Sequence, residues 1–149
     1  MDAVTFIVPG EPVPQPRPRV STRGGFARAY VPSVHPVHAF RKAVAMQAKA
    51  AGLRQTGDMI DVGIVAAFAR PKSHRTTKGL RKGAPALPRP DVDNIAKAVL
   101  DALQDVIGDD THVRRLIVEK RYGDEAATFV KVAKALQNDT AELAQRANH

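Results

Sequence analysis

DVDNIAKAVLDALQDVIGDDTHV, residues 91–113, carries the clearest helical pattern in the chain. Its apolar residues recur every three or four positions, which is typical of one buried face of an α-helix: Ile95, Val99, Ala102, Leu103 and Val106. Gly108 follows the last of them and suits the residue that ends a helix. The pattern therefore predicts a helix over Asn94–Val106.

Runs of β-branched and apolar residues on both sides of this helix predict strands. They cover Thr5–Val8, Met59–Ala67, Arg115–Tyr122 and Ala126–Val132, and we expect the last two to form a hairpin around Gly123–Glu125. The apolar run of Met59–Ala67 indicates a strand that is buried on both faces.

Two further helices are expected. Helical spacing predicts one over His35–Ala51, and a capping-box pattern predicts a short one over Thr140–Ala147. The fold class is therefore α+β, with a single-layer mixed sheet and helices packed on it. The chain has 149 residues, which suits one domain over 1–149.

The composition excludes several kinds of site. The chain has no cysteine, so disulfides, thiolate metal sites and cysteine nucleophiles are ruled out. It has no apolar run long enough to span a membrane and no secretory signal pattern at Met1–Val4, so we expect a cytoplasmic protein without a membrane partner. A net charge of +8 favours a polyanionic partner such as nucleic acid.

The positive charge is concentrated in two segments. Glu11–Arg19 has proline at every second position from Pro12, which predicts an extended, polyproline-like loop. Arg70–Pro90 has seven Lys and Arg residues and no acid, so we expect a long basic loop rather than an ordinary linker. The candidate DNA-binding residues are Arg17, Arg19, Arg23, Arg75, Lys78, Arg81, Lys82 and Arg89.

Acidic residues are concentrated directly after the basic loop, with six Asp between Asp91 and Asp110. A surface that only binds DNA gains nothing from clustered carboxylates, because they repel phosphate, whereas a Mg²⁺ site needs them. Asp91 and Asp93 can converge on one cation. Asp110 lies beyond a helix about 20 Å long, so the chain would have to bring the start of the next strand back beside the helix N-terminus.

Each of these residues also has an ordinary structural interpretation. Asp91 or Asp93 can cap the helix, and Asp109 with Asp110 can form a turn. Lys97 lies four residues before Asp101, which suits a surface ion pair.

Arg89–Leu103, followed by Gly108–Val113, resembles the RusA family of Holliday junction resolvases, and Pro9–Arg19 resembles the opening motif of that family. The resemblance covers roughly residues 4–132 and leaves a C-terminal tail, 133–149, without an assigned role. It implies a homodimeric endonuclease that resolves four-way DNA junctions by paired symmetric nicks in recombination and repair.

The resemblance also implies the catalytic residues. By position, Asp91, Asp93 and Asp110 would bind Mg²⁺, for which Mn²⁺ would substitute, and Lys97 would be the catalytic lysine. The sequence leaves open whether one or two ions are bound.

Three other functions fit the sequence less well. A nuclease of the PD-(D/E)xK kind would need an acid where Ile95 stands. An aspartyl phosphatase would need a hydrophobic strand leading into Asp91, but Ala84–Pro90 is rich in proline. A non-catalytic nucleic-acid-binding protein explains the positive charge but leaves the acidic cluster unexplained.

Replacing Arg75, Lys78, Arg81 and Lys82 with Gln is expected to weaken DNA binding and to flatten its salt dependence. Each lost phosphate contact removes about 0.9 from the slope of log affinity against log salt for duplex DNA. Binding measured by fluorescence anisotropy at several salt concentrations tests this, and an unchanged slope would refute the assignment.

Overall fold

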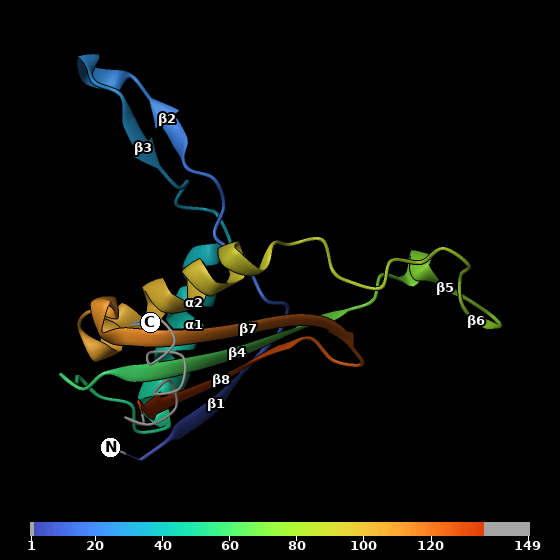
Figure 1. Ribbon diagram of the computed structural model, residues 1–149. Helices are drawn as coiled ribbons and strands as arrows, with labels where there is room; N and C mark the ends of the chain where they lie inside the picture. Colours follow the sequence, from blue (N-terminus) through green and yellow to red (C-terminus); the bar gives the residue numbers. More distant parts are fainter. Residues whose placement is uncertain (1, 136–149) are drawn as a thin grey trace, which may run out of the picture.

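The computed structural model describes residues 2–135. Its centre is a mixed four-stranded sheet in the order β1-β8-β4-β7 (Figure 1). The strands are β1 (Val4–Pro9), β4 (Ile60–Ala69), β7 (Val113–Gly123) and β8 (Ala127–Lys134). β8 is antiparallel to both β1 and β4, whereas β4 and β7 are parallel. The expected α+β class with a mixed sheet is confirmed. The helix expected over Thr140–Ala147 lies outside the described residues.

The parallel pair requires a crossover, because the chain must return to the starting end of the sheet between two parallel strands. Helix α2 (Val92–Ile107) makes that return and confirms the helix expected from the sequence. The Lys120 Nζ atom near the end of β7 donates a hydrogen bond of 2.9 Å to the Pro90 carbonyl just before α2. The N-terminus of α2 therefore lies at the carboxyl ends of β4 and β7.

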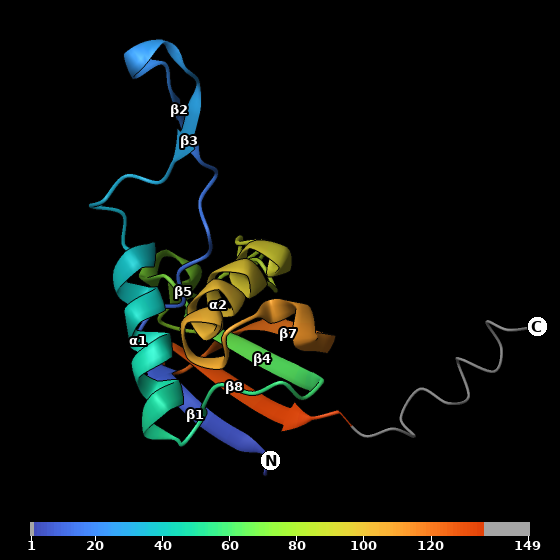
Figure 2. The same ribbon diagram turned by 90° about the vertical axis from the view of Figure 1, so that its left-hand side faces the viewer.

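Both helices pack on the same face of the sheet (Figure 2). Helix α1 (Val37–Ala50) contacts β1, and α2 contacts α1 and β7. The core is formed by the apolar faces of the helices and by alternate strand residues, among them Val44, Ile64, Leu103 and Val130.

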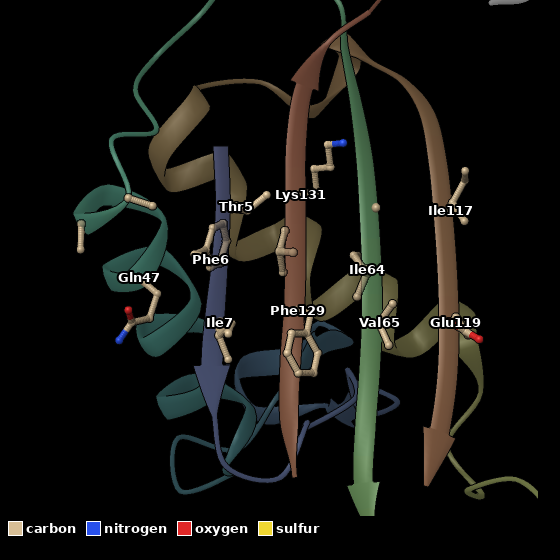
Figure 3. Close-up of a pocket in the computed structure, with 14 residues that line it drawn as sticks. Thr5, Phe6, Ile7, Gln47, Ile64, Val65, Ile117, Glu119, Phe129 and Lys131 are labelled. Carbon is tan, nitrogen blue, oxygen red and sulfur yellow. The ribbon is translucent and has the colours of Figure 1, made fainter. Parts of the chain in front are cut away.

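The expectation that the strand over Met59–Ala67 is buried on both faces is wrong for most of its length, and only its end, at Ala66 and Ala67, has consecutive buried residues. Ile60, Val62 and Ile64 are buried, but Asp61, Gly63 and Val65 between them are only half-buried. The reason is that both helices cover one face, and within residues 2–135 no helix covers the other. On that open face the sheet forms a hollow of about 890 Å³, with Ile7, Val65, Ile117 and Phe129 along it (Figure 3).

The predicted hairpin is also corrected. β7 and β8 follow each other through a short connection, but they do not pair, because β4 lies between them and pairs with both. The connection from Gly123 to Ala127 therefore passes across the end of β4. Turn residues show that the chain reverses direction, but they do not show whether another strand inserts between the two arms.

Two basic extensions project from this body (Figure 1). The first begins with the Pro-rich segment Glu11–Arg19 and holds β2 (Arg19–Ser21), a 3-10 turn η1 (Arg23–Gly25) and β3 (Arg28–Tyr30), and we call it the N-terminal arm. The second, Arg70–Pro90, holds the 3-10 turn η2 (Lys72–His74) and a minimal hairpin of β5 (Arg75–Thr76) with β6 (Gly79–Leu80). We call it the basic loop. The sequence predicted loops here, and the short strands are additions to that prediction.

In the part of the chain that the structure describes, neither helix combines the length and the apolar character that a membrane crossing requires.

The packing of α2 predicts the cost of a cavity. The Leu103 side chain is fully buried, so Leu103→Ala should lower the free energy of unfolding by about 2–5 kcal/mol. Leu80→Ala is the matched control, because Leu80 is 55% exposed in the basic loop and should change the stability by less than about 0.5 kcal/mol. Urea unfolding followed by circular dichroism measures both, and equal effects would contradict the packing described here.

Candidate functional site

Two carboxylates stand at the start of α2. Asp91 is the N-cap residue, with extended backbone angles of φ −73° and ψ 141°, but its side chain makes no capping hydrogen bond. The Asp93 Oδ1 atom, in the first helical turn, accepts a hydrogen bond of 2.9 Å from the Asn94 N–H. Both residues are exposed. Asp91 therefore does not perform the capping role that its position allows.

The Pro-rich segment of the N-terminal arm packs against the same helical turn. The backbone N–H of Gln15 donates a hydrogen bond of 2.9 Å to the Asn94 carbonyl. This contact fixes the root of the arm beside Asp91 and Asp93.

A pocket of about 560 Å³ lies at this end of the sheet. The Pro-rich segment, the ends of β4 and β7 and the basic loop all contribute to its wall, which includes Glu11, Phe68, Tyr122 and Arg89. Glu11 is exposed and adds a carboxylate that the sequence analysis did not place in the site. The sequence did contain a signal for this residue, because Glu11 is the only acidic residue in the Pro9–Arg19 motif.

The base of the basic loop is held against β7 by aromatic contacts. The Arg70 guanidinium lies 4.2 Å from the centre of the Tyr122 ring, and its Nη1 atom donates a hydrogen bond of 2.8 Å to the Pro85 carbonyl. His74 packs edge-on against Tyr122 at a centroid distance of 5.8 Å. Such contacts stabilise a cation on a ring face and fix where the loop leaves the body.

Lys97 forms the ion pair that its spacing allows. Its Nζ atom lies 2.8 Å from the Asp101 Oδ1 atom, one helical turn further on. The Lys97 side chain is 60% exposed, so this pair contributes little to stability and can be exchanged for another anion.

Asp109 and Asp110 lie at the opposite end of α2. Gly108, with φ 102°, ends the helix. The Asp109 Oδ1 atom then accepts a hydrogen bond of 2.9 Å from the Thr111 N–H. This bond and one from the Thr111 side chain lower the pKa of Asp109, so Asp109 performs the expected turn role. Asp110 begins the 3-10 turn η3 (Asp110–His112), which leads into β7.

A single chain does not bring its three candidate metal ligands together. The 16 residues of α2 span about 24 Å between the ends that carry Asp91 and Asp110. For Asp110 to reach Asp91, the start of the strand after α2 was expected to return beside the N-terminus of the helix. This expectation about the topology is wrong. β7 is parallel to β4, so the end of β7, and not its start, reaches the N-terminus of α2.

The donor set fits a hard divalent cation only in part. Asp91 and Asp93 offer carboxylate oxygens, which Mg²⁺ prefers, and Mg²⁺ usually retains several waters. However, the described residues contain no group of three or more His, Cys, Asp or Glu side chains close enough to hold a metal. Within the described residues of one chain, Asp91 and Asp93 therefore offer at most part of the donor set that such a cation needs.

The candidate DNA-binding residues lie on the two extensions and are all exposed. Arg17, Arg19 and Arg23 are in the N-terminal arm, and Arg75, Lys78, Arg81, Lys82 and Arg89 are in the basic loop. Both extensions leave the body near the N-terminus of α2 (Figure 1). The exposed carboxylates thus lie between two positively charged extensions rather than within either of them.

The sequence is similar to known proteins over most of its length. The family described as endodeoxyribonuclease RusA matches residues 9–133. The uncharacterized protein YqaN of Bacillus subtilis (strain 168) is 34% identical over 142 residues, which cover 89% of this chain and 96% of that protein.

Proposed function

The chain belongs to the RusA family of endodeoxyribonucleases, and on that premise we propose that it resolves four-way DNA junctions as a homodimer by paired symmetric nicks. Membership in this family implies Holliday junction resolvase nuclease activity. We further propose that Mg²⁺, or Mn²⁺ in its place, is bound by Asp91, Asp93 and Asp110, and that the reaction serves recombination and repair.

The main support for this proposal is the pair of exposed carboxylates at the start of α2. Asp91 and Asp93 are exposed at the start of α2, and Asp91 is not used as a cap. Two such carboxylates beside a surface of positive charge would be unfavourable for DNA binding alone, because they repel phosphate. A bound divalent cation reverses that effect, since it attracts phosphate oxygens to the same place.

The third ligand is proposed to come from the partner. Asp110 follows the far end of α2, about 24 Å from Asp91 along the 16-residue helix. In a two-fold symmetric dimer with antiparallel α2 helices, the end of one α2 lies beside the start of the other. Asp110 of each protomer can then join Asp91 and Asp93 of its partner, and the dimer contains two equivalent sites.

The chain's own residues position the DNA for the reaction. A divalent cation held by these aspartates would supply Lewis acidity and would lower the pKa of a water molecule. Lys97, one turn after Asp93 and highly exposed, can leave Asp101 and direct its ammonium towards the scissile phosphate, where negative charge increases in the transition state. The N-terminal arm and the basic loop contact phosphates on either side and give affinity without reading the base sequence.

The other enzyme classes are less compatible with the structure. Ile95, at the position where a PD-(D/E)xK nuclease needs an acid, is fully buried in α2. The residues leading into Asp91 form no strand, as an aspartyl phosphatase would require. A non-catalytic DNA-binding protein remains the alternative that the following experiment excludes or supports.

Wild-type protein with Mg²⁺ is expected to place paired, symmetric nicks in a synthetic four-way junction and to leave a linear duplex of the same sequence intact. Asp93→Asn should abolish cleavage while junction binding survives, because a ligand is lost but the basic surface is not. Asp105→Asn is the matched control, because Asp105 is also an exposed acid on α2. This variant should cleave the junction like wild type.

Gel electrophoresis of end-labelled junctions measures the nicks, and a mobility shift in Ca²⁺ measures binding. If the wild type binds the junction but cuts it in neither Mg²⁺ nor Mn²⁺, the proposed activity is refuted and the non-catalytic function is favoured.

A further inference from the structure

We propose that Phe26, at the tip of the N-terminal arm, stacks on a DNA base that is left uncovered at a branch point. This contact lets the protein distinguish branched DNA from linear DNA. The proposal rests on the proposed function and deepens it, because it identifies a residue that selects the branched substrate.

Phe26 is the most exposed phenylalanine or tyrosine among residues 2–135. It is 73% exposed, whereas Tyr30 and Phe129, the next in order, are 45% and 44% exposed. None of the residues of β2, η1 and β3 is buried. An isolated two-stranded ribbon of this kind is at best marginally stable in water. Within the arm there is therefore no core that Phe26 could join.

A tight turn holds Phe26 at the tip of the arm. Gly24 and Gly25 both have φ 83°, in the left-handed region that favours glycine. The Gly25 N–H donates a hydrogen bond of 3.1 Å to the Thr22 carbonyl. A Cβ atom added to either glycine would meet no atom within 4 Å, so the tip stands clear of the body, as Figures 1 and 2 also show. Phe26 follows this turn directly with extended backbone angles.

The charge around Phe26 indicates what kind of partner its ring meets. Residues 12–57 contain no Asp or Glu, and the part of them in the arm carries four exposed arginines, Arg17, Arg19, Arg23 and Arg28. Arginine binds phosphate through parallel hydrogen bonds, and its planar group also stacks on rings. The arm therefore fits a phosphate backbone better than it fits an apolar protein surface.

The ribbon gathers its cations on one face. In the register of β2 with β3, Arg19 lies opposite Tyr30. Ser21 lies opposite Arg28, two positions nearer the tip. Residues that are directly opposite or two positions apart share a face, so Arg19, Arg28 and Tyr30 lie on the same side. This face can follow a phosphate backbone and direct the tip towards the bases.

The arm is long enough to reach a branch point near the nick. Its root is held beside Asp91 and Asp93 by the hydrogen bond from the Gln15 N–H to the Asn94 carbonyl. From Gln15 to Phe26 the chain can span at most about 40 Å. One turn of duplex DNA is about 34–36 Å long. With the two carboxylates at the scissile phosphate, the tip therefore reaches DNA within about one helical turn of it.

The state of the bases explains why this contact favours branched DNA. In a linear duplex each base pair is covered on both faces, and inserting a ring requires a step to unstack, which is costly. At a branch point the stack is interrupted, so a neighbouring base pair can present an uncovered face. Aromatic side chains stack on such faces whatever the base, because every base has a π-face. Phe26 therefore adds affinity for branched DNA and little affinity for a linear duplex.

Phe26→Ala tests the stacking contact, with binding measured by fluorescence anisotropy in Ca²⁺ on a four-way junction and on a linear duplex of the same sequence. Affinity for the junction should fall about tenfold, the size of one lost stack of a base on an aromatic ring. Affinity for the duplex should stay within about twofold. Val34→Ala is the matched control, because Val34 is 91% exposed just beyond the arm, and this variant should bind both like wild type.

Two further substitutions separate stacking from simple apolar contact. Phe26→Trp should keep the affinity for the junction, whereas Phe26→Leu, which is apolar but has no ring, should lose it. Unchanged junction affinity in Phe26→Ala would overturn the proposal and leave the ring for a protein partner. An equal loss on both DNAs, or full affinity in Phe26→Leu, would also overturn it.

Salt dependence shows whether Phe26→Ala only disorders the arm. A lost stack removes no phosphate contact, so the slope of log affinity against log salt should match wild type. Arg23→Gln removes one such contact and should reduce the slope by about 0.9. A slope that falls in Phe26→Ala as well would mean that the arginines no longer bind, and it would overturn the stacking role.

The same experiments separate this inference from the proposed function. Wild type that binds the junction no more tightly than the duplex, and cuts neither, would refute the proposed function and this inference with it. Wild type that cuts the junction, while Phe26→Ala keeps the full preference for it, would refute only the role of Phe26.

Discussion

The parallel pairing of β4 with β7 is the constraint on which the rest of the structure depends. Two parallel strands cannot be joined by a tight turn, so the chain must cross over, and the crossover contains both the basic loop and α2. This arrangement fixes the start of α2 at the carboxyl ends of both strands, where open sheets of this kind commonly bind ligands. Asp91 and Asp93 lie there together with the roots of both basic extensions.

The same constraint separates the carboxylates. Because β7 must begin at the end of the sheet where α2 finishes, Asp110 is held at the far end of the helix from Asp91. In the proposed function, a single chain would therefore carry one part of the site at each end of α2. Two-fold symmetry can remove the separation. The start of α2 in one protomer can then lie beside the end of α2 in its partner. Under the proposed function, catalysis would therefore require the dimer.

The sequence predicted the local elements well and their arrangement less well. The apolar spacing from Ile95 to Val106 identified α2, and β-branched runs identified the four sheet strands, because these signals depend on neighbouring residues alone. The order of strands depends on long-range pairing, so the insertion of β4 between β7 and β8 was not visible. The half-exposed face around Val65 depends on where the helices pack, which the pattern does not encode. For the site, Asp91 and Asp93 could be placed at a helix start, whereas the position of Asp110 followed from topology.

Mixing two inactive variants tests the shared site most directly. In a dimer of Asp93→Asn with Asp110→Asn, a site built across the interface leaves one centre with all three aspartates and the other with neither Asp93 nor Asp110. After statistical exchange about half of the dimers are mixed, so the account predicts that junction nicking returns, with one nick per junction instead of two. A site built within one chain would leave both centres defective, and a mixture that stays inactive despite verified exchange would contradict the account.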